Sequence, residues 1–92
     1  MIMQMDRIIY VRDKGNFIVG GIKKEKYNEE TLNKLKGNKI WVEGKNGNRL
    51  ILDVIDVQPS ISFNGDYIVG IGVKQSITDN DVKKHTQVYI MD

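Results

Sequence analysis

Along the chain, stretches rich in isoleucine, valine, leucine and tyrosine are separated at short intervals by glycine and asparagine. Short apolar stretches between turn-forming residues are typical of antiparallel β-strands joined by tight turns. The pattern therefore predicts an all-antiparallel arrangement of six strands. We expect these strands at Arg7–Arg12, Phe17–Ile22, Lys39–Glu43, Arg49–Val57, Asp66–Lys74 and Thr86–Met91.

Two groups of turn-forming residues predict hairpins between consecutive strands. Residues 13–16 join the first two strands. Asn46 and Gly47, between the third and fourth strands, form the strongest short-range hairpin signal that a sequence carries. A two-residue turn there would place Ile40 opposite Asp53, which conflicts with a single apolar face. We therefore expect either a longer turn or a β-bulge in this hairpin.

The fourth and fifth strands have distinctive compositions. The fourth carries apolar residues on both faces, so we expect it to be covered on two sides, as in a strongly curved sheet. Pro59 is expected to end it, because proline has no N–H to donate to a neighbouring strand. In the fifth strand, Gly70 and Gly72 leave little bulk on one face. This predicts the close approach of another backbone or of a helix, or a sharp bend that closes a barrel.

One clear helix is predicted between Asn28 and Gly37. Asn28 suits the N-cap position, the two glutamates that follow it favour the positive end of the helix dipole, and Gly37 suits the left-handed residue after the C-terminus. Leu32 and Leu35 lie three residues apart and form a narrow apolar stripe. We expect this stripe to lie on the sheet and the remaining faces to meet water.

The order of predicted elements is ββαβββ, a short connection with a helical turn capped by Thr78, and a final strand. This is a mainly β fold with one short helix. A small, partly open antiparallel barrel of the OB or SH3-like kind is the favoured architecture, and a strongly curved sheet packed on one helix is the alternative. The length of 92 residues predicts a single domain spanning 1–92.

Composition supports a folded domain and excludes several classes of site. Hydrophobic residues make up 40% and charged residues 28% of the chain, which is typical of globular proteins. The absence of cysteine excludes disulfides, thiolate nucleophiles and cysteine-ligated metals. The N-terminal residues lack the pattern of a secretory signal, and no apolar run has the length of a membrane span. We therefore expect a cytoplasmic protein without membrane attachment.

Catalytic and metal-binding patterns are not recognisable. His85 is the only histidine and has no partner motif for a general base or a histidine-based metal site. Asp53 and Asp56, three residues apart, point to opposite faces of a strand unless a bulge realigns them, which favours solvent-facing or edge-protecting roles. Residues 79–81 resemble the opening of a calcium loop, but Lys83 occupies its fifth position. We expect no catalytic residue, no metal and no cofactor.

Two adjacent glycines, Gly20 and Gly21, follow a predicted strand, which is where nucleotide-binding loops begin in many enzymes. Neither of the two usual motifs, GxGxxG and GxxxxGK[ST], is present. We interpret these residues as turn or bulge glycines. An enzyme without a recognisable motif is therefore only the second alternative function.

Charge is divided along the chain, although the net charge is only +2. From Lys23 to Arg49, eight basic residues stand against four glutamates, and from Asp53 onward six aspartates stand against three lysines. Cations interleaved with aromatic rings are the groups that hold single-stranded nucleic acid. The alternative interpretation is that Tyr27 and Trp41 are packing residues and that the lysines only keep the surface soluble. The position of Trp41 distinguishes the two, because an exposed Trp41 would favour nucleic-acid binding. The candidate binding residues are Lys23, Lys24, Lys26, Tyr27, Trp41, Lys45 and Arg49.

These observations favour a non-enzymatic module that acts by macromolecular association. The first hypothesis is a protein partner, bound in the manner of an inhibitor, immunity or accessory protein. Small size, divided charge and sheet edges suit docking by charge complementarity or strand addition, and the same edges could pair two copies into a homo-oligomer. The alternative is binding of single-stranded RNA or DNA through segment 23–49 with Trp41.

Overall fold

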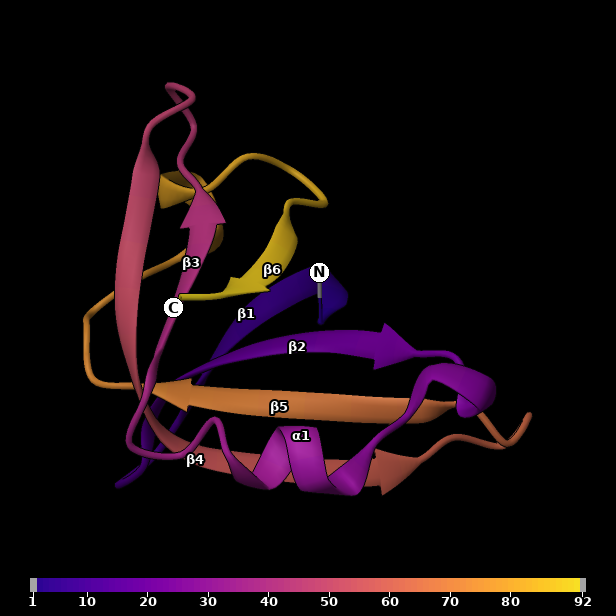
Figure 1. Ribbon diagram of the computed structural model, residues 1–92. Helices are drawn as coiled ribbons and strands as arrows, with labels where there is room; N and C mark the ends of the chain where they lie inside the picture. The colour runs from indigo at the N-terminus through magenta and orange to yellow at the C-terminus, as the bar shows by residue number, and fades with distance from the viewer. Residues whose placement is uncertain (1, 92) are drawn as a thin grey trace.

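Six antiparallel strands form a closed ring in the computed structural model, which describes residues 2–91 (Figure 1). Neighbours around the ring follow the order β1-β2-β5-β4-β3-β6. This confirms the predicted small β barrel, with a closed ring in place of a partly open one. The strands are β1 (Met3–Val11), β2 (Gly15–Ile22), β3 (Lys39–Glu43), β4 (Arg49–Ile61), β5 (Tyr67–Val73) and β6 (Gln87–Ile90). The helical segments are the 3-10 turn η1 (Lys24–Lys26), helix α1 (Glu29–Asn33) and the 3-10 turn η2 (Asp79–Asp81).

The ring is uneven because its last strand is short. The β1–β2, β2–β5 and β4–β5 pairs run over most of the length of their strands. In contrast, β6 pairs with β1 only at Met3 and Gln4, and with β3 only at Ile40 and Trp41. Four residues of β6 therefore close the ring against two partners.

Strand β1 begins at Met3, four residues before the predicted start at Arg7. A β-bulge between Met5 and Arg7 leaves two consecutive residues, Asp6 and Arg7, exposed. The inward-facing residues are Met3 and Met5 before the bulge and Ile8 after it. The bulge breaks the alternation of apolar and polar residues. The sequence pattern therefore hid the first part of the strand.

Strand β4 runs from one half of the ring to the other, as its bend in Figure 1 shows. It pairs with β3 up to Asp53 and with β5 from Val54, with a bulge between Val54 and Asp56. The prediction that Pro59 ends this strand is wrong, because β4 continues to Ile61. Proline is tolerated where the missing N–H would face away from the neighbouring strand. Val57, two residues earlier on the same edge, donates its N–H to the Asp56 carboxylate and not to β5.

The β3–β4 hairpin has the longer turn that the pattern allowed. Gly44 donates its N–H to the carbonyl of Asn48 at 2.6 Å, so the turn consists of residues 45–47. Gly47 takes a φ of +85°, a left-handed conformation that favours glycine. The extra residue places Ile40 opposite Leu52 and Lys39 opposite Asp53. Ile40 and Leu52 thereby meet on the inner face of the hairpin. Lys39 and Asp53 meet on the outer face, which also carries Trp41 and Ile51.

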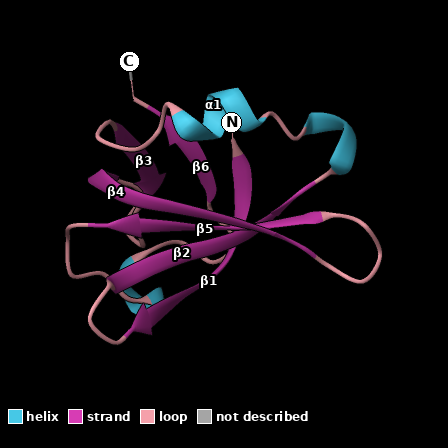
Figure 2. Cartoon of the chain, turned by 90° about the horizontal axis from the view of Figure 1, so that it is seen from below, coloured by secondary structure: helices cyan, strands magenta, loops and turns pink. Residues whose placement is uncertain are grey.

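Helix α1 covers the end of the barrel at which β1 begins and β6 ends (Figure 2). The Asn28 side chain accepts the N–H of Thr31 at 3.1 Å, as predicted for the N-cap. Regular helix stops at Asn33, earlier than expected, and turns lead on to Gly37. Leu32 and Leu35 are nevertheless buried in the core, which confirms the predicted apolar stripe. The barrel interior consists of Met3, Met5, Ile18, Ile22, Ile40, Val42, Leu52, Val54, Val69, Ile71, Val73, Ile77, Val82 and Val88.

Three glycines have close neighbours, and the contact that excludes a side chain most firmly is that of Gly20. A Cβ on Gly20 would overlap the carbonyl oxygen of Gln4, with the carbonyl carbon only 3.1 Å away. Gly20 lies inside β2, opposite the bulge of β1, so of the two predicted roles, turn glycine or bulge glycine, the structure favours the second. On the outer face of the sheet, the Phe17 ring lies against Gly70 and Gly72, at 3.4 and 3.0 Å from their added Cβ positions. The predicted close approach is thus made by a side chain and not by a backbone or the helix.

Side chains protect the strand edges that the ring leaves unpaired. Asp79 accepts the N–H of Ile8 in β1 at 2.8 Å. In β4, Asp56 accepts the N–H of Val57 at 2.9 Å, and Pro59 has no N–H to offer. Occupied donors and proline are common means of preventing strand addition. These features disfavour the addition of a further strand at these two edges.

Within the described residues, no helix combines the length and the apolar character that crossing a membrane requires.

Candidate binding surfaces

The two carboxylates of β4 lie on the same outer face, because the bulge between Val54 and Asp56 realigns them. Asp53 receives hydrogen bonds from the Lys39 ammonium and from Gln75 Nε2, and these bonds, that of Lys39 foremost, hold its pKa below the usual range. Asp56 accepts from Val57 N and Gln58 Nε2, each at 2.9 Å. The two groups share no partner. Each has its own structural role, as an ion pair or as edge protection.

Metal-binding groups are not assembled in the part of the chain that the structure describes. Among residues 2–91, no three His, Asp or Glu side chains gather closely enough to hold an ion.

Trp41 lies on the outer surface of the barrel and not in its core. Its ring stacks on Tyr89 of β6, with centroids 4.2 Å apart and planes 14° from parallel. The Arg49 guanidinium of β4 lies over the Trp41 ring at 4.2 Å from the centroid. Since β4 and β6 flank β3 on opposite sides, Arg49 and Tyr89 cover opposite faces of the indole. We call these three side chains the Trp41 stack.

A cleft of about 490 Å³ lies beside this stack, between the η1–α1 segment and the end of the barrel. Its aromatic wall is formed by Trp41 and Tyr89. Its polar wall is formed by Lys26, Asn28 and Thr31. Apolar side chains complete it, and we call it the end cleft. The remaining lining residues are Ile2, Ile22, Leu32 and Ile90.

Sequence reasoning missed Tyr89, although a signal for it was present. Val88 is completely buried, so strand alternation places Tyr89 on the outer face of β6. Its register partner on β3 is Trp41. What the sequence alone could not supply is the pairing of the third strand with the last.

The seven predicted binding residues are only partly brought together. Lys26 and Trp41 share the end cleft, and Arg49 joins them through its contact with the indole. Lys45 lines a separate cleft with Arg49 at the β3–β4 hairpin. Lys24 is exposed on η1.

Two of the seven lie with β5 and its preceding turn. Lys23 pairs with Asp66 at 3.9 Å. Tyr27 stacks on Tyr67 with centroids 3.6 Å apart. Burial, followed by the Glu29 charge, raises the pKa of Tyr27. The ring is half-buried and packs against the core, so Tyr27 is a packing residue.

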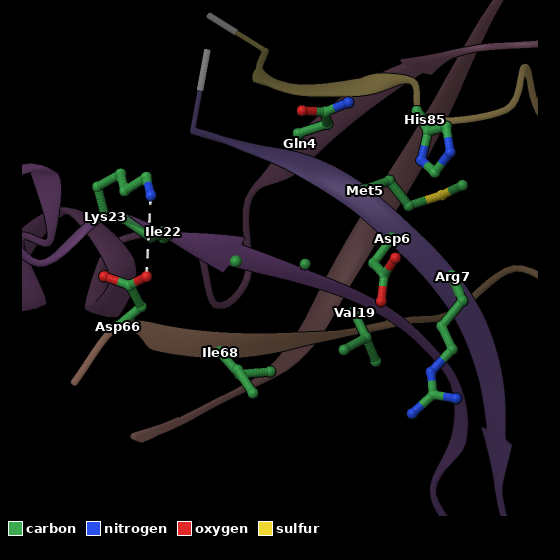
Figure 3. A pocket seen from close by; sticks show the side chains of 12 residues that line it. Gln4, Met5, Asp6, Arg7, Val19, Ile22, Lys23, Asp66, Ile68 and His85 are labelled. Carbon is green, nitrogen blue, oxygen red and sulfur yellow. Dashed lines mark ion pairs between the residues drawn. The ribbon is translucent and has the colours of Figure 1, made fainter. Parts of the chain in front are cut away.

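A second concave surface lies on the outer face of β1, β2 and β5, with a volume of about 490 Å³ (Figure 3). Gly20 and Gly21 of β2 line it and contribute no side chains. The ion pair of Lys23 and Asp66 closes one end, and Asp6 and Arg7 lie toward the other. We call this surface the glycine groove. The other residues along it are Gln4, Met5, Val19, Ile22, Ile68 and His85.

His85 borders the glycine groove in an unusual backbone conformation. Its φ is +57°, within a turn in which Thr86 donates its N–H to Lys83 at 3.0 Å. Histidine is among the residues that tolerate the left-handed region at modest cost. The turn directs the chain from η2 back into β6.

The β4–β5 hairpin extends beyond the ring as an arm, residues 59–66, visible at the right of Figure 1. At its tip Phe63 is fully exposed, and Ile61 is 66% exposed. The turn itself is ordered by hydrogen bonds, from Ser62 N to Asp66 O at 2.8 Å and from Gly65 N to Ser62 O at 3.1 Å. Phe63 stands between two polar turn residues, Ser62 and Asn64, and this position is the signal that the sequence offers for it.

Comparison with known proteins adds no relative, since no protein-family model, no curated protein and no solved structure matches the chain.

Proposed function

We propose that this domain is a protein-binding module that docks through the tip of its β4–β5 arm. The observation that carries the proposal is the full exposure of Phe63 on an ordered turn, with Ile61 exposed beside it. Single exposed apolar residues are common, but two large ones at the tip of a projecting hairpin form a compact apolar contact. A partner with an apolar pocket would remove both side chains from water.

The energetic argument rests on burial and on order. Burying a phenylalanine side chain contributes about 1.5 to 3 kcal/mol. Aromatic anchors of this kind dominate many interfaces. The hydrogen-bonded turn already holds the arm in one conformation, so binding loses little additional entropy there.

The glycine groove provides a second contact beside the arm. Asp66, the last residue of the arm, and Ile68, two residues further along the chain, line the groove. Ile68 is 40% exposed, and the groove carries both acidic and basic side chains at its ends. An apolar centre with a charged rim is the usual composition of a protein interface. A module of this kind acts by occupying a surface of its partner, as inhibitors, immunity proteins and accessory subunits do.

Replacing Phe63 with alanine should abolish partner capture without unfolding the domain. The immobilised chain is incubated with lysate of the native host, and a stoichiometric partner is identified and then titrated in purified form. Loss of a central aromatic anchor costs about 2 kcal/mol or more, which corresponds to at least about 30-fold weaker binding.

Tyr10→Ala is the matched control, because Tyr10 is 71% exposed at the opposite end of the sheet, beside the β1–β2 turn. This variant should retain the partner. If Phe63→Ala and Tyr10→Ala bind the partner as tightly as the unmodified chain, the arm is not the docking site. Recovery of chaperones alone would argue against a protein partner altogether.

A second candidate function is the binding of single-stranded nucleic acid, favoured by the position of Trp41 on the outer surface. The Trp41 stack places an indole, a phenol and a guanidinium side by side, and Lys26 lies in the adjoining cleft. Small barrels that bind single strands combine stacking rings with cations in this way.

A short single-stranded oligonucleotide should change the emission of Trp41, the single tryptophan. Binding should weaken steeply as salt increases, because cations that neutralise phosphates release counterions. Tyr89→Leu should weaken binding by about tenfold, since stacking contributes about 1 to 3 kcal/mol per base. No binding at low salt would exclude this function.

A further inference from the structure

The end cleft combines three kinds of surface. One wall is aromatic, one wall is polar, and the floor is apolar, with Leu32 buried and Ile90 partly exposed. Its volume of about 490 Å³ lies within the range of about 300–1,000 Å³ typical of small-molecule sites. Such sites use apolar surface for affinity and a few convergent polar groups for orientation.

The aromatic wall leaves one ring face for a ligand. Arg49 and Tyr89 cover the two faces of Trp41. The face on which a further planar ring can stack is therefore that of Tyr89 turned away from the indole. A ring in that position continues an existing column of parallel groups, and offset or parallel stacking of this kind is favourable.

The polar wall points to an anion. Lys26 is exposed and takes part in none of the ion pairs found among residues 2–91. The Asn28 oxygen is occupied by the N–H of Thr31, so the Asn28 side chain has its amide hydrogens to donate. The Thr31 hydroxyl is a further donor in the same wall. An ammonium, an amide and a hydroxyl together suit a phosphate.

We propose that the end cleft binds a nucleoside monophosphate, with the base stacked on Tyr89 and the phosphate held by Lys26 and Asn28. The site is separate from the β4–β5 arm, so it does not depend on the first function proposed above. It shares Tyr89 and Lys26 with the nucleic-acid candidate but requires a single nucleotide and no chain of nucleotides. The recognition elements come from three segments distant in sequence, namely η1–α1, β3 and β6.

The test is a titration of the full chain with AMP, GMP, CMP and UMP, followed by Trp41 emission and by calorimetry. We expect saturable binding with one ligand per chain for at least one of the four. The matching nucleoside, which lacks the phosphate, should bind about tenfold more weakly or worse, because a charge-assisted hydrogen bond is lost. Ribose 5-phosphate, which lacks the base, should bind about tenfold more weakly or worse as well.

Lys26→Ala should lower the affinity for the monophosphate to that for the nucleoside, while the affinity for the nucleoside itself stays unchanged. This pattern would show that Lys26 contacts the phosphate, because a purely structural role of Lys26 would affect the binding of both ligands. Lys24→Ala is the matched control, because Lys24 belongs to the same turn η1 but does not line the end cleft. Tyr89→Leu should weaken both ligands by about tenfold.

Three results would overturn the proposal. The first is absence of saturable binding by all four monophosphates at millimolar concentration to a chain with an intact β-sheet spectrum. The second is an equal loss in Lys24→Ala and Lys26→Ala. The third is binding of the oligonucleotide alone, which would support the nucleic-acid function and exclude a mononucleotide site.

Discussion

Gly20→Ala is expected to destabilise the domain by about 3 kcal/mol or more, a large fraction of the stability of a small protein. The new methyl group would meet the carbonyl group of Gln4, which belongs to the backbone of β1 and cannot rotate away. Relief requires the β1–β2 pair to separate where the β1 bulge already disturbs the ladder. Denaturant unfolding monitored by Trp41 emission measures the loss.

Gly21→Ala is the matched control for this prediction. A methyl group on Gly21 has only the carbonyl oxygen of Tyr67 nearby, at an ordinary contact distance of 3.8 Å. The free energy of unfolding should therefore stay the same or rise by about 0.4 to 1 kcal/mol, since alanine restricts the unfolded chain. Equal losses in the two variants would show that β1 and β2 are not packed as described.

Phe17→Ala is expected to lower the free energy of unfolding by about 3 kcal/mol. Phe17 is 4% exposed although it lies on the outer face of the sheet, because its ring rests on Gly70 and Gly72. Removing the ring leaves a space that two glycines cannot fill, and uncovers the β5 backbone. The change should appear as a lower denaturant midpoint with an unchanged slope.

Phe63→Ala provides the comparison, since the chain has only two phenylalanines. Phe63 makes no buried contact, so its removal should alter stability by less than about 0.5 kcal/mol. Both variants remove a phenyl ring, from a buried position at Phe17 and from a fully exposed position at Phe63. A destabilisation of Phe63→Ala comparable with that of Phe17→Ala would mean that the arm folds back onto the barrel.

Local signals accounted for much of the fold. The Asn28 cap, the Leu32 and Leu35 stripe and the need for a longer turn near Gly47 follow from interactions within a few residues of one another. These features depend on backbone conformation and on the spacing of apolar residues. Both can be inferred from residue types that lie close together in the sequence.

Features that depend on distant segments were missed or misplaced. Pro59 could be accommodated inside β4 only because its N–H position faces away from β5, and the sequence does not reveal which edge is paired. The bulge at Asp6 concealed the start of β1 for a similar reason. Likewise, the glycines of β5 signalled a close approach, but Phe17 as the approaching group depends on the register of β2.

The residues of the candidate surfaces also fall into two groups, those that residue type and charge identified and those that depend on the pairing of distant strands. Trp41, Arg49 and Lys26 were identified from residue type and charge, and the structure places them around one stack and one cleft. Tyr89 entered only through the pairing of β3 with β6. Phe63 was not among the predicted binding residues, because these were chosen from the basic segment 23–49.

Closure of the ring has a consequence for the kinetics of folding. The contacts that join β6 to β1 connect residues near positions 3 and 88, the widest sequence separation among the strand pairs. They comprise only two residue pairs, as do the contacts between β6 and β3. The largest entropy cost of loop closure is therefore offset by a small gain in strand pairing. Local hairpins such as β1–β2 form at much lower entropic cost than this long-range contact. The seam beside β6 is consequently the natural last step of assembly and the first place at which the native barrel opens.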